Sequence, residues 1–394
     1  MGKPKIRFKG YEDDWEQRKV GNFLTESREV GHKGDVAHKM TVKLWSKGIC
    51  EKNEAGSSNT QYFIRHTGQF IYSKLDFLNC AFGVVPKNLE SFETTADVPA
   101  FDCNEINPYF MFYTAIQPAF YKKNGIIADG SRKAKRIHVE TFLNMPFFIP
   151  NLEEQNKIVD ALSSLDHLIT LHQRKCEETK SLKKYMLQKM FPENGKCVPK
   201  IRFSGFSDDW EQRKVSEIGN IVTGSTPKTS ISDNYGGEFL FVSPADIQEN
   251  RYVDETITTL TKKGFDQGRK IREKASLFVS IGSTIGKVAQ TSQESTTNQQ
   301  INAVEPYDNF DDDFIFTSLE NISGSIKAIA SNQAVPIVNK TTFGETEIKV
   351  PSELAEQQKI GADFRNLDHL ITLHQHKCDE LQKLKKFMLQ NMFV

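Results

Sequence analysis

The sequence contains one nine-residue stretch, LDHLITLHQ, at residues 165–173 and again, unchanged, at residues 367–375. Each copy lies within a longer pattern of mainly apolar residues that recur at alternating steps of three and four. Such a period of about 3.5 residues is typical of a helix that pairs with another helix. Lys, Glu, Gln and Asp fill the intervening positions, as expected for a surface that faces water. We therefore predict two long helices whose apolar stripes pack against each other.

The predicted seam between these helices uses equivalent positions in the two copies. They are Ile158, Leu162, Leu165, Ile169, His172 and Cys176 in the first copy and Ile360, Phe364, Leu367, Ile371, His374 and Cys378 in the second. The two His and two Cys residues could in principle bind zinc tetrahedrally. A small thiol and a hydrogen-bonded imidazole also pack well in a seam, and we favour this interpretation, with no metal.

A second repeat lies near the start of the chain. Residues 4–20 match residues 199–215 at fourteen of 17 positions, both ending in WEQRKV. Residues 24–147 and 219–348, by contrast, show no resemblance to each other. A repeat this long indicates duplication of a domain rather than a solenoid. We predict two tandem units with common ends and different bodies, and therefore two distinct recognition surfaces.

The repeats also predict domain boundaries and a direction for the helices. The predicted domains are residues 1–149 and 193–350, and the predicted helices are residues 150–192 and 351–394. Each helix would span ~60 Å at ~1.5 Å per residue. A compact body of about 155 residues is only roughly 40 Å wide and cannot bridge that length. We therefore expect antiparallel helices, an internal pseudo-two-fold, and a C-terminus close to the N-terminal segment.

Composition indicates an ordinary globular protein rather than a coat for nucleic acid. The 394 residues include 51 Lys and Arg against 51 Asp and Glu, so there is no overall basic excess. Six cysteines without a C-x-x-C pair are expected to be reduced thiols in a cytoplasmic protein. The first residues lack the apolar run of a signal peptide, and no stretch approaches membrane-spanning length.

No motif in the sequence predicts catalysis by this chain. The run from Gly282 to Val288, GSTIGKV, has one residue too few between its glycines for a phosphate-binding loop. It also has Val288 where such a loop needs Ser or Thr for Mg²⁺. We predict a glycine hairpin there instead. We expect no cofactor on this chain, and no zinc-protease, nucleotide-binding or catalytic-triad motif is found.

If the chain binds DNA, basic clusters are the candidates for phosphate contacts, and the polar side chains of adjoining loops are candidates for reading bases. The candidates are Lys122, Lys123, Arg132, Lys133, Lys135 and Arg136 in the first body and Thr226, Lys228, Arg269, Lys270, Arg272 and Lys287 in the second. The alternative is that these charges are ordinary solvated surface.

Several motifs together resemble one known family. They are the duplicated WEQRKV, TGSTPKT at 223–229, FVSPADI at 241–247, GSTIGKVA at 282–289, NQQINA at 298–303, and P-x-x-x-E-Q-x-K-I at 150–158 with a near copy at 351–360. Because these motifs occur together and in this order, the chain resembles the DNA-specificity subunit of a type I restriction–modification system over essentially its whole length. IYSKLDFLNCAFGVVP at 71–86 resembles a different subgroup of target-recognition domains, in keeping with two dissimilar bodies.

The resemblance implies an α+β fold in which two target-recognition domains are separated by two long antiparallel coiled-coil helices. Each domain would read one half of a bipartite asymmetric DNA site, and the helices would set the spacer between the halves. It also implies partners that carry the chemistry. These are two modification subunits, which bind S-adenosylmethionine and methylate adenine, and restriction subunits, which use ATP and Mg²⁺.

Two alternatives from other classes remain open on the residues alone. A duplicated coiled-coil scaffold could serve as an adaptor for two proteins without binding DNA. A stand-alone nuclease is less favoured, because the carboxylate motif that would hold its metal is absent.

Overall fold

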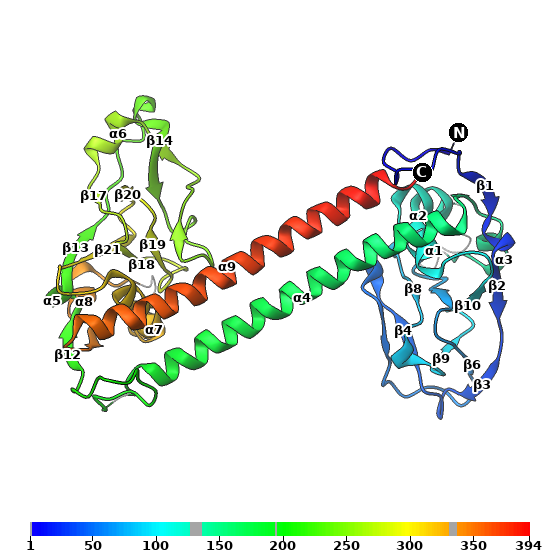
Figure 1. The fold of residues 1–394 in the computed structure, drawn as a ribbon, viewed down its shortest axis with the longest axis horizontal. Coiled ribbons are helices and arrows are strands. Elements are labelled where there is room, and N and C mark those ends of the chain that lie inside the picture. Colours follow the sequence, from blue (N-terminus) through cyan, green and yellow to red (C-terminus); the bar gives the residue numbers. More distant parts are fainter. Residues whose placement is uncertain (1, 127–135, 194, 331–336) are drawn as a thin grey trace. The chain divides into compact units, whose positions relative to one another are not determined.

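The computed structural model describes the chain except residues 1, 127–135, 194 and 331–336 (Figure 1). The fold divides into two compact units, Met1–Leu171 with Cys378–Val394, and His172–Lys377. We call them the first unit and the second unit. Each contains one body and part of both long helices, α4 (Leu152–Met190) and α9 (Leu354–Asn391). None of the described helices combines the length and hydropathy that a membrane crossing requires.

The body of the first unit is built on short antiparallel strands and a core rich in aromatic rings. β1 (Glu16–Lys19) pairs with β11 (Pro146–Ile149), and one sheet has the order β2-β10-β7-β8 and another β3-β6-β9. These strands are Leu24–Ser27, Ala100–Cys103, Phe70–Tyr72 and Phe82–Val84, then Val30–Lys33, Gln61–Ile64 and Glu93–Thr95. Helices are α1 (Pro108–Ala115), α2 (Pro118–Gly125) and α3 (Val139–Leu143), and β4 (Met40–Val42) forms a hairpin with β5 (Ile49–Glu51). In this core the centroid of the Phe142 ring lies 4.6 Å from that of Tyr72 and 5.8 Å from that of Phe70.

The body of the second unit has larger sheets and a longer helix. β12 (Glu211–Lys214) pairs with β22 (Glu347–Val350), and two sheets have the orders β13-β21-β18-β19-β15 and β16-β14-β20-β17. These strands are Gly219–Thr223, Ile301–Pro306, Ser276–Val279, Val288–Thr291 and Tyr252–Val253, then Thr259–Leu260, Tyr235–Val242, Ser295–Thr297 and Lys270–Ile271. The helices are α5 (Val215–Ile218), α6 (Lys262–Gln267), α7 (Asp312–Ala330) and α8 (Lys340–Gly344). The predicted glycine hairpin is confirmed, because the GSTIGK loop joins antiparallel strands β18 and β19.

The two bodies share a scaffold that their sequences do not reveal. In the first unit Trp15, Phe110 and Phe393 form a triad of rings with centroids 5.6 to 6.3 Å apart. In the second unit Trp210, Phe314 and Phe191 form the same triad at 5.6 to 5.7 Å. Each triad joins the segment before the first strand, the helix of the body, and the end of a long helix. The duplication therefore extends into bodies whose sequences have diverged.

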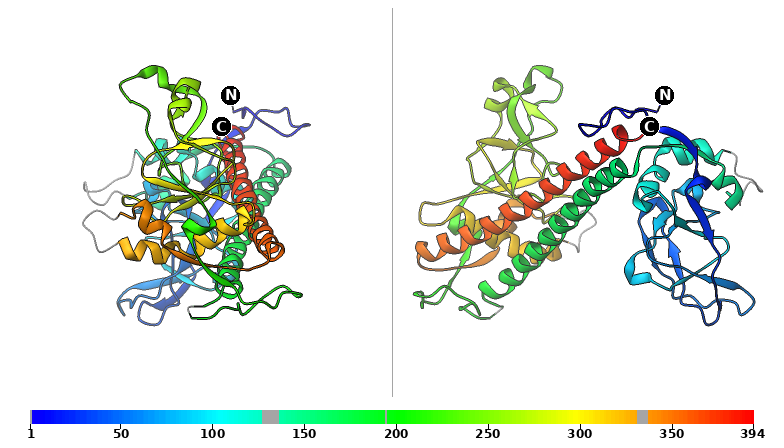
Figure 2. Two further views of the ribbon diagram at one scale, coloured as in Figure 1. Left: turned by 90° about the vertical axis from the view of Figure 1, so that its left-hand side faces the viewer. Right: turned by 45° about the vertical axis from the view of Figure 1, so that its right-hand side comes forward.

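The long helices run antiparallel in each unit. In the first unit Leu165, Ile169 and Leu381 form a hydrophobic cluster, and Lys385 Nζ lies 2.5 Å from Asp166 Oδ1. In the second unit His172 lies beside His374, and Lys183 Nζ lies 2.6 Å from Asp368 Oδ1. Numbers rise along α4 as they fall along α9 in both places, and the two ribbons lie side by side in Figures 1 and 2. The predicted α+β fold with antiparallel coiled-coil helices is therefore confirmed.

The structure places the predicted seam residues between the helices and in the cores of the bodies. Ile158 and Leu162 belong to the core of the first unit, and Ile360, Phe364 and Leu367 belong to that of the second. The remaining members are buried (Leu165, Ile169, Cys176 and Cys378) or half-buried (His172, Ile371 and His374). The stripe thus binds each helix to its body at one end and to the other helix towards the middle.

The segment before each first strand docks on the far end of a long helix. Ile6 N donates to Asn391 O at 2.9 Å in the first unit, and Ile201 N donates to Lys189 O at 2.9 Å in the second. The predicted proximity of the C-terminus to the N-terminal segment is therefore confirmed within the first unit. The first described residues and the C-terminus lie close together in Figures 1 and 2.

A Glu-Gln pair near the start of each long helix makes the same contacts in both units, which explains why the sequence around it is duplicated. Glu154 is buried and accepts two hydrogen bonds from Arg7, at 2.6 and 2.8 Å. Glu356 accepts the equivalent bonds from Arg202 at 2.7 and 2.9 Å. These carboxylates also raise the pKa of both guanidinium groups. The next residue, Gln155 or Gln357, bridges the first turn of its helix to the start of the body helix.

The sequence suggests Asn151 and Ser352 as the N-caps of the two long helices. Asn151 does cap α4, by accepting from Glu154 N at 2.9 Å, but α9 begins at Leu354, so Glu353 rather than Ser352 lies at its N-cap position. Helix α7 was not predicted at all. Its sequence is rich in β-branched residues and Ser, which lowers helix propensity, and burial of Phe314, Ile315 and Leu319 overrides that preference.

The pairing of His172 with His374 in the seam is expected to make the stability of the folded chain depend on pH. Burial, with added positive charge from His172 and Lys175, lowers the pKa of His374. Below about pH 6.5 the unfolded chain therefore takes up a proton that the folded chain resists, and stability falls as the pH falls. We expect the melting temperature to drop between about pH 7.5 and about pH 5.5, and His374→Asn to flatten that drop. His376→Asn, which alters an exposed residue of the same helix, is the control and should leave the slope unchanged.

Candidate nucleic-acid interface

Loops that are far apart in the sequence come together at one edge of the second unit. Gly224 N donates to Ile301 O at 3.1 Å, Ser225 N donates to Thr297 O at 2.9 Å, and Thr226 Oγ1 donates to Gln299 Oε1 at 2.6 Å. A side chain at Gly224 would place its Cβ 2.1 Å from Asn298 O, so only glycine permits this approach. The motifs TGSTPKT and NQQINA are therefore two sides of one surface.

Arg269 belongs to the same surface. Its backbone N donates to Ser225 Oγ at 3.2 Å, and its Nη1 donates to Thr223 O at 2.8 Å, while the side chain remains exposed. We call Thr223–Thr226, Arg269 and Asn298–Gln300 the polar loop cluster. It combines a fixed cation with hydroxyl and amide groups, which are the groups that contact phosphates and base edges.

A chain of buried and partly buried hydrogen bonds supports the polar loop cluster. Thr223 Oγ1 donates to Asn302 Oδ1 at 2.6 Å, and Asn302 Nδ2 donates to Ser280 Oγ at 2.8 Å. Ser280 N in turn donates to Gln300 O at 2.7 Å. Ser280 follows β18 and precedes the GSTIGK loop, so the start of this hairpin loop helps to position the cluster.

The other predicted residues of the second body differ in their surroundings. Lys228 and Lys270 are exposed, and Lys270 pairs with Asp266 at 2.9 Å. Arg272 instead binds Asp312 through two nitrogens, at 2.6 and 2.9 Å, and ties β17 to the start of α7. Lys287 Nζ donates to Ile247 O at 2.9 Å and is only partly exposed. Thr226 and Arg269 are therefore the predicted residues that the structure brings together.

The predicted basic residues of the first body are only partly described. Lys122 and Lys123 are exposed on the last turn of α2, and Arg136 Nη2 lies 3.6 Å from Asp97 Oδ2. Arg132, Lys133 and Lys135 lie outside the described residues. Within the described part of the chain, no three His, Cys, Asp or Glu side chains lie together in a way that could bind a metal ion.

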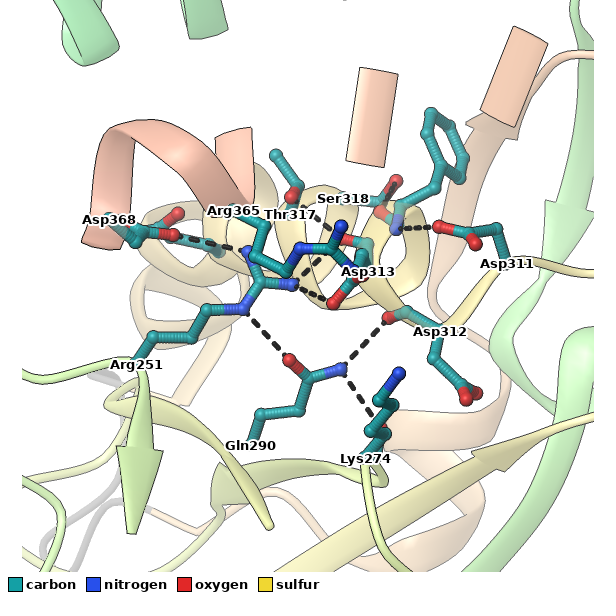
Figure 3. A network of polar contacts seen from close by, with 12 residues as sticks. Arg251, Lys274, Gln290, Asp311, Asp312, Asp313, Thr317, Ser318, Arg365 and Asp368 are labelled. Atoms are coloured by element: carbon teal, nitrogen blue, oxygen red, sulfur yellow. Dashed lines mark hydrogen bonds and ion pairs between the residues drawn. The ribbon is translucent and has the colours of Figure 1, made fainter. Parts of the chain in front are cut away.

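A buried polar network that sequence reasoning missed fixes the body of the second unit to α9 (Figure 3). Arg251, whose side chain is 2% exposed, donates to Asp313 Oδ1 at 2.7 Å, Asp368 Oδ2 at 3.2 Å and Gln290 Oε1 at 2.8 Å. Arg365 donates to the other oxygen of Asp313 at 2.7 Å. The partners lie 39 to 117 residues from Arg251, so no local pattern in the sequence could have indicated them.

The first turn of α7 is organised by the same network. Asp311 Oδ1 accepts from Phe314 N at 2.8 Å, and burial raises the pKa of the Asp311 carboxyl. Gln290 Nε2 donates to Lys274 O at 3.0 Å and to Asp312 O at 3.3 Å, as drawn in Figure 3. The network thus joins β19, α7 and α9 and holds the body on the helix that supports it.

Comparison with known proteins identifies the family. A family model described as "Type I restriction modification DNA specificity domain" matches residues 13–181 and again residues 207–383. The chain belongs to this family. The specificity-subunit resemblance and the duplication are both confirmed, and an adaptor unrelated to DNA specificity is no longer a competing interpretation.

Relatives of this type I specificity chain agree with the assignment. It is 28% identical over 191 residues to the type I restriction enzyme MjaIX specificity subunit of Methanocaldococcus jannaschii, covering 47% of this chain and 44% of that one. It is 33% identical over 148 residues to the HindI specificity subunit of Haemophilus influenzae, covering 36% and 32%. The matches thus span less than half of either relative. The crystal structure of the S subunit from M. genitalium has the same fold, with a TM-score of 0.69 at 14% identity, covering 100% of this chain and 99% of that one.

Proposed function

We propose that this chain recognises a bipartite, asymmetric DNA sequence, with each body reading one half. The observation that carries the proposal is a common scaffold that presents different surfaces. The aromatic triads, the strand pairs β1/β11 and β12/β22, and the antiparallel order β2-β10-β7-β8, which recurs as β13-β21-β18-β19, are duplicated. The second sheets, β3-β6-β9 and β16-β14-β20-β17, differ in strand number and order. One supporting frame with two sets of loops is suited to reading two unlike sequences.

In this proposal the long helices fix the spacer between the half sites. α4 and α9 are continuous over 39 and 38 residues and bind each body through the seam and the Glu-Gln pairs. Base contacts come from loops such as the polar loop cluster, and exposed cations contribute phosphate contacts that weaken as salt rises.

The proposed partners are two modification subunits and the restriction subunits of the same system. Support comes from exposed apolar residues that recur at equivalent positions on the two helices. The pairs, with exposed fractions, are Leu168 (39%) and Leu370 (42%), Leu182 (48%) and Leu384 (45%), and Tyr185 (50%) and Phe387 (51%). One set, Leu168, Leu384 and Phe387, lies in the first unit, and the other lies in the second. A surface that occurs once in each unit is suited to two copies of one partner.

Chemistry belongs to those partners in this proposal. The modification subunits bind S-adenosylmethionine and methylate adenine, and the restriction subunits use ATP and Mg²⁺. The role of this chain is to place them on a chosen sequence.

Exchange of one body tests the proposal. Residues 24–147 are replaced by the equivalent segment of a specificity chain with a different target, keeping an aromatic residue at the position of Phe110 so that the triad with Trp15 and Phe393 survives. The variant is expressed with its modification subunits, and methylated adenines are mapped across the host genome. We expect one half of the methylated sequence to change while the other half and the spacer remain.

The matched control is the exchange of residues 219–348, which should change the opposite half. Methylation of the original sequence by the first exchanged chain would contradict the proposal. So would loss of any sequence preference in a chain that folds and assembles normally.

A further inference from the structure

The hairpin between β4 and β5 of the first unit has a strained tip. Lys43 N donates to Gly48 O at 2.8 Å, and Lys47 N donates to Leu44 O at 3.4 Å across the turn. Trp45 (φ 58°, ψ 37°) and Ser46 (φ 55°) are both left-handed. Asn and Gly usually occupy these two positions, because a side chain with a Cβ crowds the backbone there. A tryptophan at such a position is therefore costly for folding and calls for another explanation.

Contacts at the base of the hairpin hold the strained turn in place. Ser46 N donates to Cys80 O at 2.9 Å, and Ser46 Oγ lies 3.2 Å from the same oxygen and 3.1 Å from Cys80 Sγ. Ile49 packs so closely against β8 that a Cβ at Gly83 would lie 2.8 Å from it. The tip is therefore a fixed projection of the body.

This tip presents an aromatic ring to solvent. Trp45 is 59% exposed and Leu44 is 42% exposed, whereas Trp15 (4%) and Trp210 (2%) are buried. Lys43 and Lys47 are both exposed on either side. The tip thus combines a small apolar point with two positive charges, and more than half of the Trp45 surface lies outside the fold.

We infer that Trp45 is a DNA-contacting residue that packs against the bases of duplex DNA while Lys43 and Lys47 contact the adjacent phosphates. Apolar side chains on a rigid projection act as wedges that partly unstack a base step, and flanking cations bind the backbone. The positive charge favours a polyanion over a protein surface, and two apolar side chains are too few for a stable protein interface. The inference rests on the proposed function and assigns to the first body a contact outside its predicted basic residues.

Intrinsic fluorescence of the full chain provides a direct test, because Trp45 is its solvent-exposed tryptophan. The probe is a duplex of about 30 base pairs that carries the methylated sequence found by genome mapping. We expect the duplex to quench the emission of the wild type and to protect it from acrylamide. Trp45→Phe should remove that signal and bind within about threefold of the wild type, whereas Trp45→Ala should bind about tenfold more weakly.

A glycine variant separates this role from folding. Trp45→Gly relieves the left-handed strain, so the melting temperature should stay the same or rise by a few degrees while DNA binding weakens as in Trp45→Ala. Tyr109→Ala, which removes another exposed aromatic ring of the first unit, should change neither property.

Three results would contradict the inference. Equal DNA binding by the wild type and Trp45→Ala overturns it and leaves the proposed function standing. Loss of a modification subunit from Trp45→Ala, with DNA binding intact, also overturns it and indicates a protein contact instead. If the wild type binds this duplex no better than a duplex of unrelated sequence, the proposed function fails, and the inference fails with it.

Discussion

Replacing Arg251 with alanine is expected to lower the free energy of unfolding by about 3 kcal/mol, because it leaves buried carboxylates without their shared cation. Arg251 is 2% exposed, and Asp313 and Asp368 are 6% and 12% exposed. Removal of one partner of a buried ion pair typically costs about 3–5 kcal/mol. The lower end applies here, since Asp313 keeps Arg365 and Asp368 keeps Lys183.

The measurement is denaturant unfolding, supported by the melting temperature, which should fall by roughly 6–12 °C. Arg272→Ala is the matched control, because it removes an Arg–Asp pair from the same first turn of α7. The Arg272 side chain is 42% exposed, so its loss should cost less than about 1 kcal/mol. Equal losses in the two variants would show that burial of the network around Arg251 does not determine its contribution.

The second large effect is expected from charges placed on the exposed apolar residues of the helices. Leu384→Asp with Phe387→Asp should weaken the binding of one modification subunit at least about 100-fold, because an interface cannot bury two unpaired carboxylates. Native mass spectrometry of co-purified complexes should then show one modification subunit instead of two. Adding Leu182→Asp and Tyr185→Asp should remove the second copy and abolish site-specific methylation.

The chain itself offers the matched control for this experiment. Phe387→Tyr copies the residue at position 185 of the other repeat and should leave assembly unchanged. Full binding of two modification subunits by the four-residue variant would contradict the proposed docking surfaces. A melting temperature equal to that of the wild type would show that the charges act on assembly, since these side chains are about half exposed already.

The sequence predicts the parts of this fold that repeat or that have a clear period. The seam of Leu165 and Ile169, the β18–β19 hairpin and the docking of the chain ends follow from periodicity, glycine spacing and length. The shared scaffold of the bodies does not, because the triads depend on single aromatic residues within diverged segments. Phe110 and Phe314, for example, lie on helices of 8 and 19 residues, and only a short Phe-x-Phe match relates the two sequences.

The candidate sites were predicted less completely than the fold. Thr226 and Arg269 could be proposed from composition, but their proximity depends on how β13, β17 and β20 are placed in the sheets. Arg251 and Trp45 were missed for different reasons. The first acts through partners distant in sequence, and the second is distinguished by a backbone conformation that no residue pattern specifies.

The docking of each leading segment on a helix end has a consequence for how such a chain could arise. Ile6 contacts a residue from the second repeat, and Ile201 contacts a residue from the first. Each compact unit is thus assembled from pieces of both halves, which is the connectivity of a domain-swapped dimer whose protomers have been fused into one polypeptide. A single repeat has both a leading segment and a helix end, so two copies of it could complete each other before gene fusion let the bodies diverge.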